Sequence, residues 1–495
     1  MSFYSKKALI SFVALAAIGC IPLACSSSSR DSNDEDPDQA ALAAIPNVPS
    51  KKLDCGTPAK PGYAVCHARV RTDSNGNIKA FATPGGLGPS QLASAYLIPS
   101  TGGAGKTIAI VDANDDPNAE SDLATYRSTF GLPACTTANG CFQKVNQNGQ
   151  QSNYPSPDAG WAGEIALDID MASAACPACN ILLVEANTAS IADLGTSVNT
   201  AASLGATVIS NSYGGGEDGS EATSDSQYYT HAGVAIFAST GDGAYGASYP
   251  ATGKAVISVG GTALTTSTSA RGWAEKVWFT NSTEGTGSGC SSHVAKPSYQ
   301  TQTACSTKKA TADLSAVADP ATGVAVYDTY GGSGWAVYGG TSVSSPLVAS
   351  IFAKIGQGAA TGAYPWQNQA NFYDVTTGSN GTCSPSILCK AGTGWDGPTG
   401  VGTPNATAIA NGGGGTDAGP PADSGTGVDS GPVDSGHDSG TGTCSHAVCD
   451  QGDPLTKSCS TCATAVCKRD SYCCSTAWDD ICVSEVSRYC GQTCN

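Results

Sequence analysis

The chain has 495 residues, enough for one large domain with additional segments, and it carries a formal net charge of −17 at pH 7. This charge argues against a nucleic-acid partner, because binding to phosphates requires basic patches. The 61 glycines, the many Ser, Thr and Ala residues and the few charged residues also argue against a cytosolic protein.

The N-terminus has the pattern of an export signal over residues 1–25. Lys6 and Lys7 precede a mostly apolar run, residues 8–24, that is short for a membrane-spanning helix. The run resembles a bacterial lipoprotein signal, with Cys20 or Cys25 as the lipidated residue and membrane tether. Ordinary cleavage and secretion is the alternative. Residues 26–87 then read as a tether and a short leader. We expect a secreted protein or one on the bacterial outer surface.

The cysteine content supports export. Small disulfide-closed loops fit an oxidising compartment. Ten of the 22 cysteines lie as close neighbours in sequence: Cys55/Cys66, Cys135/Cys141, Cys176/Cys179, Cys290/Cys305 and Cys383/Cys389. Zinc ligation is the alternative for Cys176 and Cys179, although no second CxxC or His pair lies nearby.

Apolar strands alternate with helices along residues 88–411. Strands are expected at 107–112, 179–185, 206–212, 234–239 and 255–259, and helices at 120–130 and 191–204. This alternation predicts an α/β domain whose mainly parallel sheet is covered by helices on both faces. Functional sites in such sheets gather at the C-terminal ends of the strands.

Two further segments follow this domain. Residues 412–443 form a Gly/Ser/Asp/Pro linker, which we expect to be a flexible acidic spacer. Residues 444–495 contain ten cysteines and predict a small disulfide-rich module. A zinc module is the alternative, because Cys459 and Cys462 have CxxC spacing. The sequence does not indicate a ligand for this module.

Ser342 is a candidate nucleophile. A β-prone run at residues 335–338 is followed by two glycines and then by an apolar segment at 347–355, which predicts a strand, a tight turn and a helix. A helix N-terminus beneath the serine favours developing negative charge. The alternative is that Thr341 or Ser342 only caps the helix, with Pro346 in its first turn.

A carboxylate is a better candidate base than a histidine. None of the five histidines begins a helix of the Gly-Thr-His type after the strand that ends at Asp112. Glu164 and Asp168 instead lie four residues apart on one face of a predicted helix, so they are expected to share a proton. The glutamate can then act as general base, oriented by the aspartate. The alternative is a solvated acidic helix face.

Asp242 follows the strand at 234–239 and is flanked by glycines. It is either a simple turn residue or, if burial raises its pKa, a hydrogen-bond donor to an oxyanion.

The three motifs resemble those of the sedolisins, the serine-carboxyl peptidases, over about residues 88–410. They occur in the family's order: Gly163-Glu164-x-x-x-Asp168, Gly241-Asp242-Gly243 and Gly340-Thr341-Ser342-x-x-x-Pro346. The connecting segments 249–262, 296–300 and 313–320 are similar as well. The resemblance implies a subtilisin-like fold and an endopeptidase that acts on proteins or peptides in acid. We expect a monomer.

By the same resemblance, Ser342 is the nucleophile, Glu164 the general base, Asp168 its partner and Asp242 the oxyanion-hole acid, whereas Asp112 is structural. The alternative is an inactive surface binding or adhesion protein on a peptidase-like scaffold. An intact set of catalytic residues argues against that alternative.

The resemblance also implies one structural calcium ion. Its oxygen ligands would come from carboxylates and main-chain carbonyls, which suit Ca²⁺. The matching residues are Asp374, Val375, Gly392, Gly394 and Asp396. One departure from the family is that only some 60 residues precede the catalytic region, where many sedolisins carry a long prodomain. The others are Gly243 and Gly339, which stand where the family commonly has serine.

Overall fold

The computed structural model describes residues 36–56 and 60–412, together with 448–450, 454–456, 459–469, 472–474, 478, 482–483, 486 and 490. The chain divides into two compact units, Met1–Asp417 and Ala418–Asn495. The predicted signal with Cys20 and Cys25, and the linker after residue 412, lie outside the described residues. The predicted domain boundaries therefore stay predictions.

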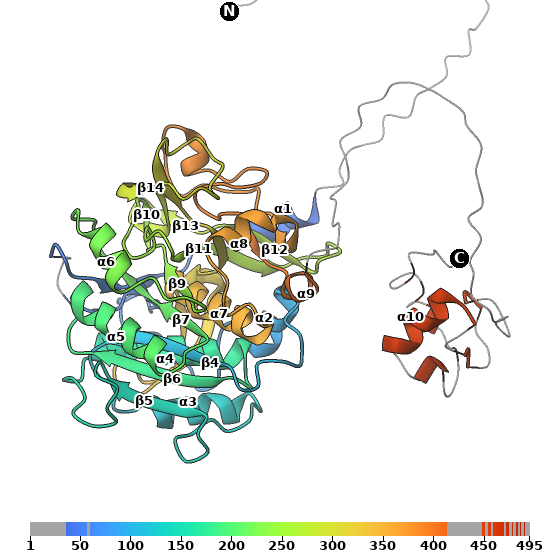
Figure 1. Cartoon of the computed structure of the whole chain (residues 1–495), viewed down its shortest axis with the longest axis horizontal. Helices are drawn as coiled ribbons and strands as arrows, with labels where there is room; N and C mark the ends of the chain where they lie inside the picture. Colours follow the sequence, from blue (N-terminus) through green and yellow to red (C-terminus); the bar gives the residue numbers. More distant parts are fainter. Residues whose placement is uncertain are drawn as a thin grey trace, which may run out of the picture. The chain divides into compact units, whose positions relative to one another are not determined.

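An eight-stranded sheet runs through the first unit (Figure 1). Its order is β12-β11-β9-β7-β4-β6-β5, with β16 also paired to β11. All neighbours are parallel except β11 and β12. The strands are β4 (Thr107–Ala113), β5 (Phe142–Asn146), β6 (Asn180–Ala186), β7 (Val208–Asn211), β9 (Ala235–Ser239), β11 (Ile257–Thr266), β12 (Trp273–Val277) and β16 (Leu314–Val317). The predicted α/β fold with a mainly parallel sheet is confirmed.

Helices cover both faces of this sheet, because alternate side chains of β4 belong to two different hydrophobic cores. Ile108 and Ile110 belong to a core that also includes α4 (Ala159–Ala175) and α7 (Thr341–Lys354). Ala109 and Val111 belong to a second core with α5 (Ile191–Ser203). Because successive strand residues point to opposite faces, these two cores lie on opposite sides of the sheet.

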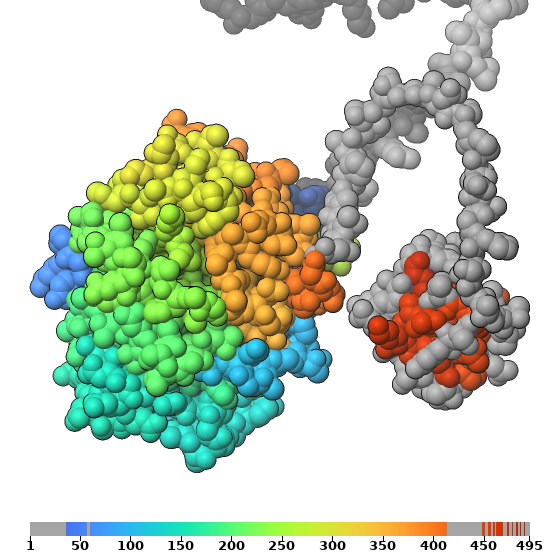
Figure 2. All heavy atoms as spheres, viewed as in Figure 1, coloured from blue at the N-terminus to red at the C-terminus, as the bar shows by residue number. Residues whose placement is uncertain are grey.

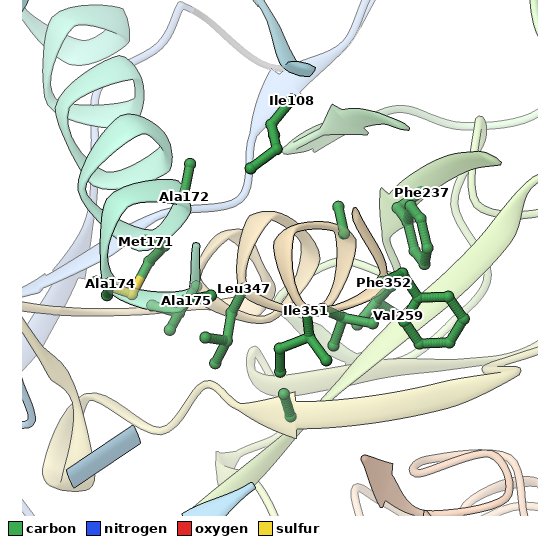
Figure 3. Packing of buried hydrophobic residues seen from close by; sticks show 14 of the residues in the cluster. Ile108, Met171, Ala172, Ala174, Ala175, Phe237, Val259, Leu347, Ile351 and Phe352 are labelled. Atoms are coloured by element: carbon green, nitrogen blue, oxygen red, sulfur yellow. The ribbon is translucent and has the colours of Figure 1, made fainter. Parts of the chain in front are cut away.

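The first of these cores includes the contact between α4 and α7. Figure 3 shows Met171 and Ala175 of α4 close to Leu347 of α7, and Phe352 of α7 beside Phe237 of β9. The last two rings meet edge to face, with centroids 5.3 Å apart. Apolar side chains surround both helices, which explains why they are buried along nearly their whole length.

Four smaller sheets complete the described part of the first unit. One of them, in the order β1-β3-β18-β17, joins the predicted leader to the strand that precedes Ser342. In Figure 2, residues of β14 and β15 (yellow) gather at the top of the unit. The strands are β1 (Ser50–Lys52), β2 (Val65–Cys66), β3 (Arg69–Arg71), β8 (Tyr213–Gly214), β10 (Gly243–Tyr245), β13 (Phe279–Asn281), β14 (Glu284–Ala295), β15 (Lys308–Thr311), β17 (Val324–Asp328), β18 (Gly334–Gly339), β19 (Phe372–Tyr373) and β20 (Thr403–Pro404).

The remaining helices of the first unit are short, apart from α3. They are α1 (Pro37–Ala43), α2 (Pro89–Ala95), α3 (Ala119–Thr129), α6 (Glu221–Gln227), α8 (Ala363–Gln367), α9 (Ala406–Ala410) and the 3₁₀ turns η1 (Pro320–Thr322), η2 (Gln369–Asn371) and η3 (Ser386–Leu388). Among the described residues, no helix has both the length and the apolar character needed to cross a membrane.

The five predicted local cysteine pairs all form disulfides. The zinc alternative for Cys176 and Cys179 is therefore wrong, because their sulfur atoms are bonded to each other.

The second unit has a small core of its own, formed by Leu455, Ala463, Val466, Trp478 and Val486 together with cysteines. It contains α10 (Thr461–Arg469) and η4 (Tyr472–Cys474). Disulfides cross-link it, among them Cys462–Cys490, Cys467–Cys474 and Cys473–Cys482. Because Cys462 is bonded to Cys490, a zinc site at the CxxC pair is excluded.

Candidate active site

Helix α4 places Glu164 and Asp168 in the interior. The Asp158 carboxylate caps the helix and accepts hydrogen bonds from the backbone N–H groups of Gly160 and Trp161, each at 3.0 Å. Both acidic side chains are fully buried. The alternative of a solvated acidic face is therefore wrong.

Ser342 stands at the start of α7, directly after β18. Gly340 is the N-cap residue with φ +93°, and the helix begins at Thr341. A Cβ at Gly340 would lie 2.0 Å from the His67 carbonyl oxygen and 2.6 Å from Asp242 Oδ2, so only glycine fits. Pro346 lies inside the helix rather than in its first turn. The alternative, that Thr341 or Ser342 only caps the helix, is therefore wrong, because Gly340 is the N-cap residue.

Asp242 follows β9 and faces the same helix start. Its Oδ1 accepts hydrogen bonds from Thr341 N at 2.8 Å and from Thr341 Oγ1 at 3.0 Å. Burial raises the pKa of Asp242 to about 6, against the lowering effects of Arg69 and Thr341. Its Oδ2 has no hydrogen-bond partner among the described residues. Asp242 is thus a buried acid that is poised to carry a proton, not a solvated turn residue.

The acids around Ser342 form one electrostatic cluster. Burial raises the pKa of Glu164 well above its usual range, and Asp168 and Asp112 raise it further, whereas the Ser342 hydroxyl lowers it. Burial also raises the pKa of Asp168, against lowering by the hydroxyl of Ser212 and by Glu164. Both oxygens of Asp168 and Oε1 of Glu164 have no donor among the described residues. Shared protons satisfy such closely spaced carboxyl groups.

Hydrogen bonds fix the orientation of the two central groups. Ser342 Oγ donates to the carbonyl oxygen of Ser212 at 3.2 Å. Glu164 Oε2 accepts from the backbone N–H of Ala68 at 2.9 Å. The structure thus brings Ser342, Glu164, Asp168 and Asp242 together at one helix start.

The structure adds residues that the sequence analysis did not place in the site. Burial raises the pKa of Asp112 well above its usual range, with Asp168 and then Glu185 as further causes, so Asp112 belongs to the acid cluster. Its position at the end of a predicted strand was the available signal. Ser212, which lies directly after β7, was likewise the last residue of a predicted strand. His67 and Ala68 of the leader carried no such signal.

His67 is not placed as a base. Its Nδ1 is 2.7 Å from Ser239 Oγ, and burial lowers the pKa of the imidazole to about 3. The ring is therefore mainly neutral above about pH 4.

The predicted calcium ligands lie together near the end of the first unit. Gly394 N donates to Asp374 Oδ2 at 2.8 Å, and Gly392 N donates to Asp396 Oδ2 at 3.2 Å. Burial raises the pKa of Asp396 to about 7, and among the smaller causes Asp374 raises it further. No Lys or Arg of the described residues pairs with either carboxylate.

Asp374 and Asp396 repel each other and have no Lys or Arg partner among the described residues, which fits a hard divalent ion between them. In the described part of the chain, no three His, Cys, Asp or Glu side chains are grouped to hold a metal. An ion here would therefore depend on main-chain carbonyls such as those of Val375, Gly392 and Gly394.

Comparison with known proteins agrees with this geometry. The pattern of the subtilase family matches residues 103–382. Kumamolisin of Bacillus sp. (strain MN-32) is 30% identical over 391 residues, which cover 71% of this chain and 68% of kumamolisin. The chain belongs to the sedolisin family.

Two further relatives and a solved structure are also similar to this chain. Sedolisin of Pseudomonas sp. (strain 101) is 27% identical over 375 residues, 68% of this chain and 62% of sedolisin. Xanthomonalisin of Xanthomonas sp. (strain T-22) is 35% identical over 240 residues, 41% of this chain and 28% of that protein. The structure of Pseudomonas sedolisin complexed with two molecules of pseudo-iodotyrostatin has a TM-score of 0.57 and 26% identity, covering 67% of this chain and 98% of that one.

The subtilisin-like fold of the sedolisin family is thus established for the first unit, and membership of the family makes the chain a serine-carboxyl peptidase homologue. Residues 442–494 match a domain of unknown function.

Proposed function

We propose that this sedolisin-family chain is a serine-carboxyl endopeptidase that hydrolyses proteins or peptides at acidic pH. The observation that carries the proposal is the buried group of Ser342, Glu164, Asp168 and Asp242 at one helix start. These four residues supply a nucleophile, a base, a partner for that base and a neutral acid.

The reaction is acyl transfer. Ser342 Oγ attacks the substrate carbonyl carbon while Glu164 takes the hydroxyl proton. Asp168 shares a proton with Glu164 and so sets its charge. Neutral Asp242 donates a hydrogen bond to the oxyanion, together with the Ser342 N–H. Glu164 then passes its proton to the leaving amine, and water releases the acyl group by the reverse sequence.

The electrostatics of the site favour acid. Asp242 must keep its proton to donate, and its pKa of about 6 gives the neutral form below that pH. Because burial raises the pKa values of Glu164 and Asp168, the pair holds one shared proton in acid, and the carboxyl group that stays ionised can accept the proton of Ser342. A neutral histidine base is not needed for this chemistry.

Hydrolysis of a denatured protein across pH 3 to 8 tests the proposal. Wild type is expected to act in acid, and Ser342→Ala is expected to keep only a small residual rate because the nucleophile is gone. Ser350→Ala is the matched control, since Ser350 is also buried on α7 and its hydroxyl has no hydrogen-bond partner among the described residues. An inactive wild type after calcium addition and acid incubation would favour the alternative, a binding or adhesion protein.

We also propose that one calcium ion binds the turn of Asp374, Val375, Gly392, Gly394 and Asp396. The carboxylates of Asp374 and Asp396, which pair with no Lys or Arg of the described residues, support this proposal. A bound ion contributes about 3 kcal/mol of stability at a hundredfold excess over its Kd.

Chelation of calcium is therefore expected to lower the Tm by about 5 °C. Asp396→Asn should abolish the calcium-dependent difference in Tm, whereas Asp218→Asn, in an exposed loop, should preserve it. A Tm that calcium leaves unchanged in wild type would contradict the site. Differential scanning calorimetry measures the shift.

Export is the final part of the proposal. The disulfides of both units support an oxidising location, secreted or on the bacterial outer surface. The lipid tether would be Cys20 or Cys25. We propose a monomer and assign no ligand to the C-terminal module.

A further inference from the structure

A segment of the chain itself shows how an extended peptide fits the candidate active site. The Ser342 N–H donates to the His67 carbonyl oxygen at 3.5 Å, and the Ala68 N–H donates to Glu164 Oε2 at 2.9 Å. The His67–Ala68 peptide bond therefore lies between the nucleophile and the base. Its position gives a register for a substrate, because the residues after this bond stand where the residues after a cleaved bond would stand.

Backbone pairing on both flanks holds this register. Before the bond, Cys66 lies opposite Tyr213 of β8, and after it Arg69 lies opposite Gly339 of β18, both in antiparallel pairs. Such pairs depend on main-chain groups, so a peptide of another sequence can form them as well. Side-chain contacts must then decide which peptides bind well.

Arg69, the second residue after the bond, meets a carboxylate. Its Nη2 lies 2.9 Å from Glu284 Oε2, and the two side chains are only 7% and 10% exposed. Arg69 Nε also donates to Ser50 Oγ at 3.3 Å, and this hydroxyl donates to Glu284 Oε1. Among the described residues, no other Lys or Arg forms an ion pair with Glu284. A neutral residue in the place of Arg69 would leave an uncompensated charge in a mostly closed site.

Glu284 belongs to the wall of the active site. It begins β14, and the residue after it donates its N–H to the Asp242 carbonyl oxygen at 3.1 Å. Burial raises the pKa of Asp242, and Arg69 is near enough to lower it. Glu284 and Asp319 also line one cavity of about 160 Å³, in which Lys276 is the single cation. A basic side chain at the position of Arg69 thus enters an acidic part of the site.

The alternation of β3 repeats this arrangement two residues later. Arg71 lies on the same face as Arg69, and its guanidinium donates to two carbonyl oxygens of η1. Val70, between them, points to the other face and is fully buried in the hydrophobic core. The side chain of the third residue after the bond is therefore directed away from Glu284.

We propose that the peptidase prefers substrates with a basic residue, above all arginine, as the second residue after the cleaved bond, and that Glu284 selects it. The inference rests on the proposed peptidase function and names its substrate class. Arginine fits best because its planar guanidinium can donate two parallel hydrogen bonds to one carboxylate, which the point charge of lysine cannot do. A substrate binds in this way when it takes the place of the chain's own segment.

Three fluorogenic peptides of equal length test the preference. The first has Arg as the second residue after the cleaved bond, the second has Gln there, and the third has Gln there and Arg one residue later. The first and third carry the same charge, so they separate a defined contact from general attraction to an acidic protein. The full disulfide-bonded chain, incubated in acid with calcium, is assayed at pH 5, below the pKa of about 6 of Asp242. Mass spectrometry identifies the cleaved bond.

Wild type is expected to hydrolyse the first peptide with a kcat/KM at least about tenfold above that of the other two. Glu284→Gln is expected to reduce the ratio between the first and second peptides to about one, because an amide carries no charge. Glu120→Gln on α3, the matched control, should keep the wild-type ratio. A ratio within one protein does not depend on how much of it is folded, so the test holds even if loss of the ion pair with Arg69 destabilises Glu284→Gln.

The outcomes separate this inference from the proposed function. If wild type hydrolyses all three peptides with similar kcat/KM, the preference is overturned and the peptidase function stands. If the third peptide is as good as the first, the attraction is general, which also overturns the inference. A preference that survives unchanged in Glu284→Gln would contradict the role of Glu284. If no peptide is hydrolysed, the peptidase function fails and the inference fails with it.

Discussion

Glu164→Gln is expected to lower kcat/KM for peptide hydrolysis by about 10³-fold, because a general base contributes on the order of 10² to 10⁴. Glutamine keeps the shape of the side chain but cannot take the proton of Ser342. The effect should fall on kcat, since the substrate contacts are unchanged. The measurement is the initial rate of hydrolysis of a peptide substrate at pH 4.

The double variant gives a sharper test of the same pair. Ser342→Ala combined with Glu164→Gln is expected to be no slower than Ser342→Ala alone, because two residues that act as one unit are not additive. Glu120→Gln, on α3 and outside the acid cluster, is the matched control. If Glu164→Gln retained more than a tenth of wild-type activity, another group would have to be the base.

Asp242→Ala is expected to lower kcat by about 10²- to 10³-fold, the usual cost of losing one oxyanion donor. Asp242→Asn should keep much of the activity, because an amide can donate the same hydrogen bond. The two variants also differ in their pH profiles. The pKa of Asp242 is about 6, so wild type has its donor below that pH and loses it as the pH rises.

Wild-type activity should therefore fall above about pH 6. The amide of Asp242→Asn does not titrate, so in this variant the alkaline limb of the pH profile, where activity falls, should move to higher pH. Profiles of kcat from pH 3 to 8 measure the difference. Asp218→Asn, an exposed acid, should keep the wild-type limb. An unmoved limb in Asp242→Asn would mean that Asp242 is not the group that titrates there.

Local patterns in the sequence predicted the sheet and the residues of the site because they depend on short spacings. The apolar run of β4 and the four-residue spacing of Glu164 and Asp168 are properties of single elements. The edge strand β5 was missed because its residues include Gln143 and Lys144, which break the apolar pattern.

The route of the leader through the site could not be predicted in this way. Val65 and Cys66 pair with Tyr213 and Gly214, and Arg69 pairs with Gly339, far along the chain. No local spacing records such contacts. The membership of Asp112 in the acid cluster also depends on tertiary packing, since Asp168 lies on a helix and Asp112 on a strand.

The buried acids have a consequence for folding stability. Asp242, Asp116 and Glu185 have pKa values raised to about 6, 7 and 9, mainly by burial, whereas the same groups in an unfolded chain titrate near 4. Between pH 4 and these values the folded state binds more protons than the unfolded state, so unfolding releases protons. The free energy of unfolding therefore includes the full contribution of these groups below about pH 4 and loses it as the pH rises through the folded pKa values. Acid thus stabilises the fold over the same range in which it protonates Asp242.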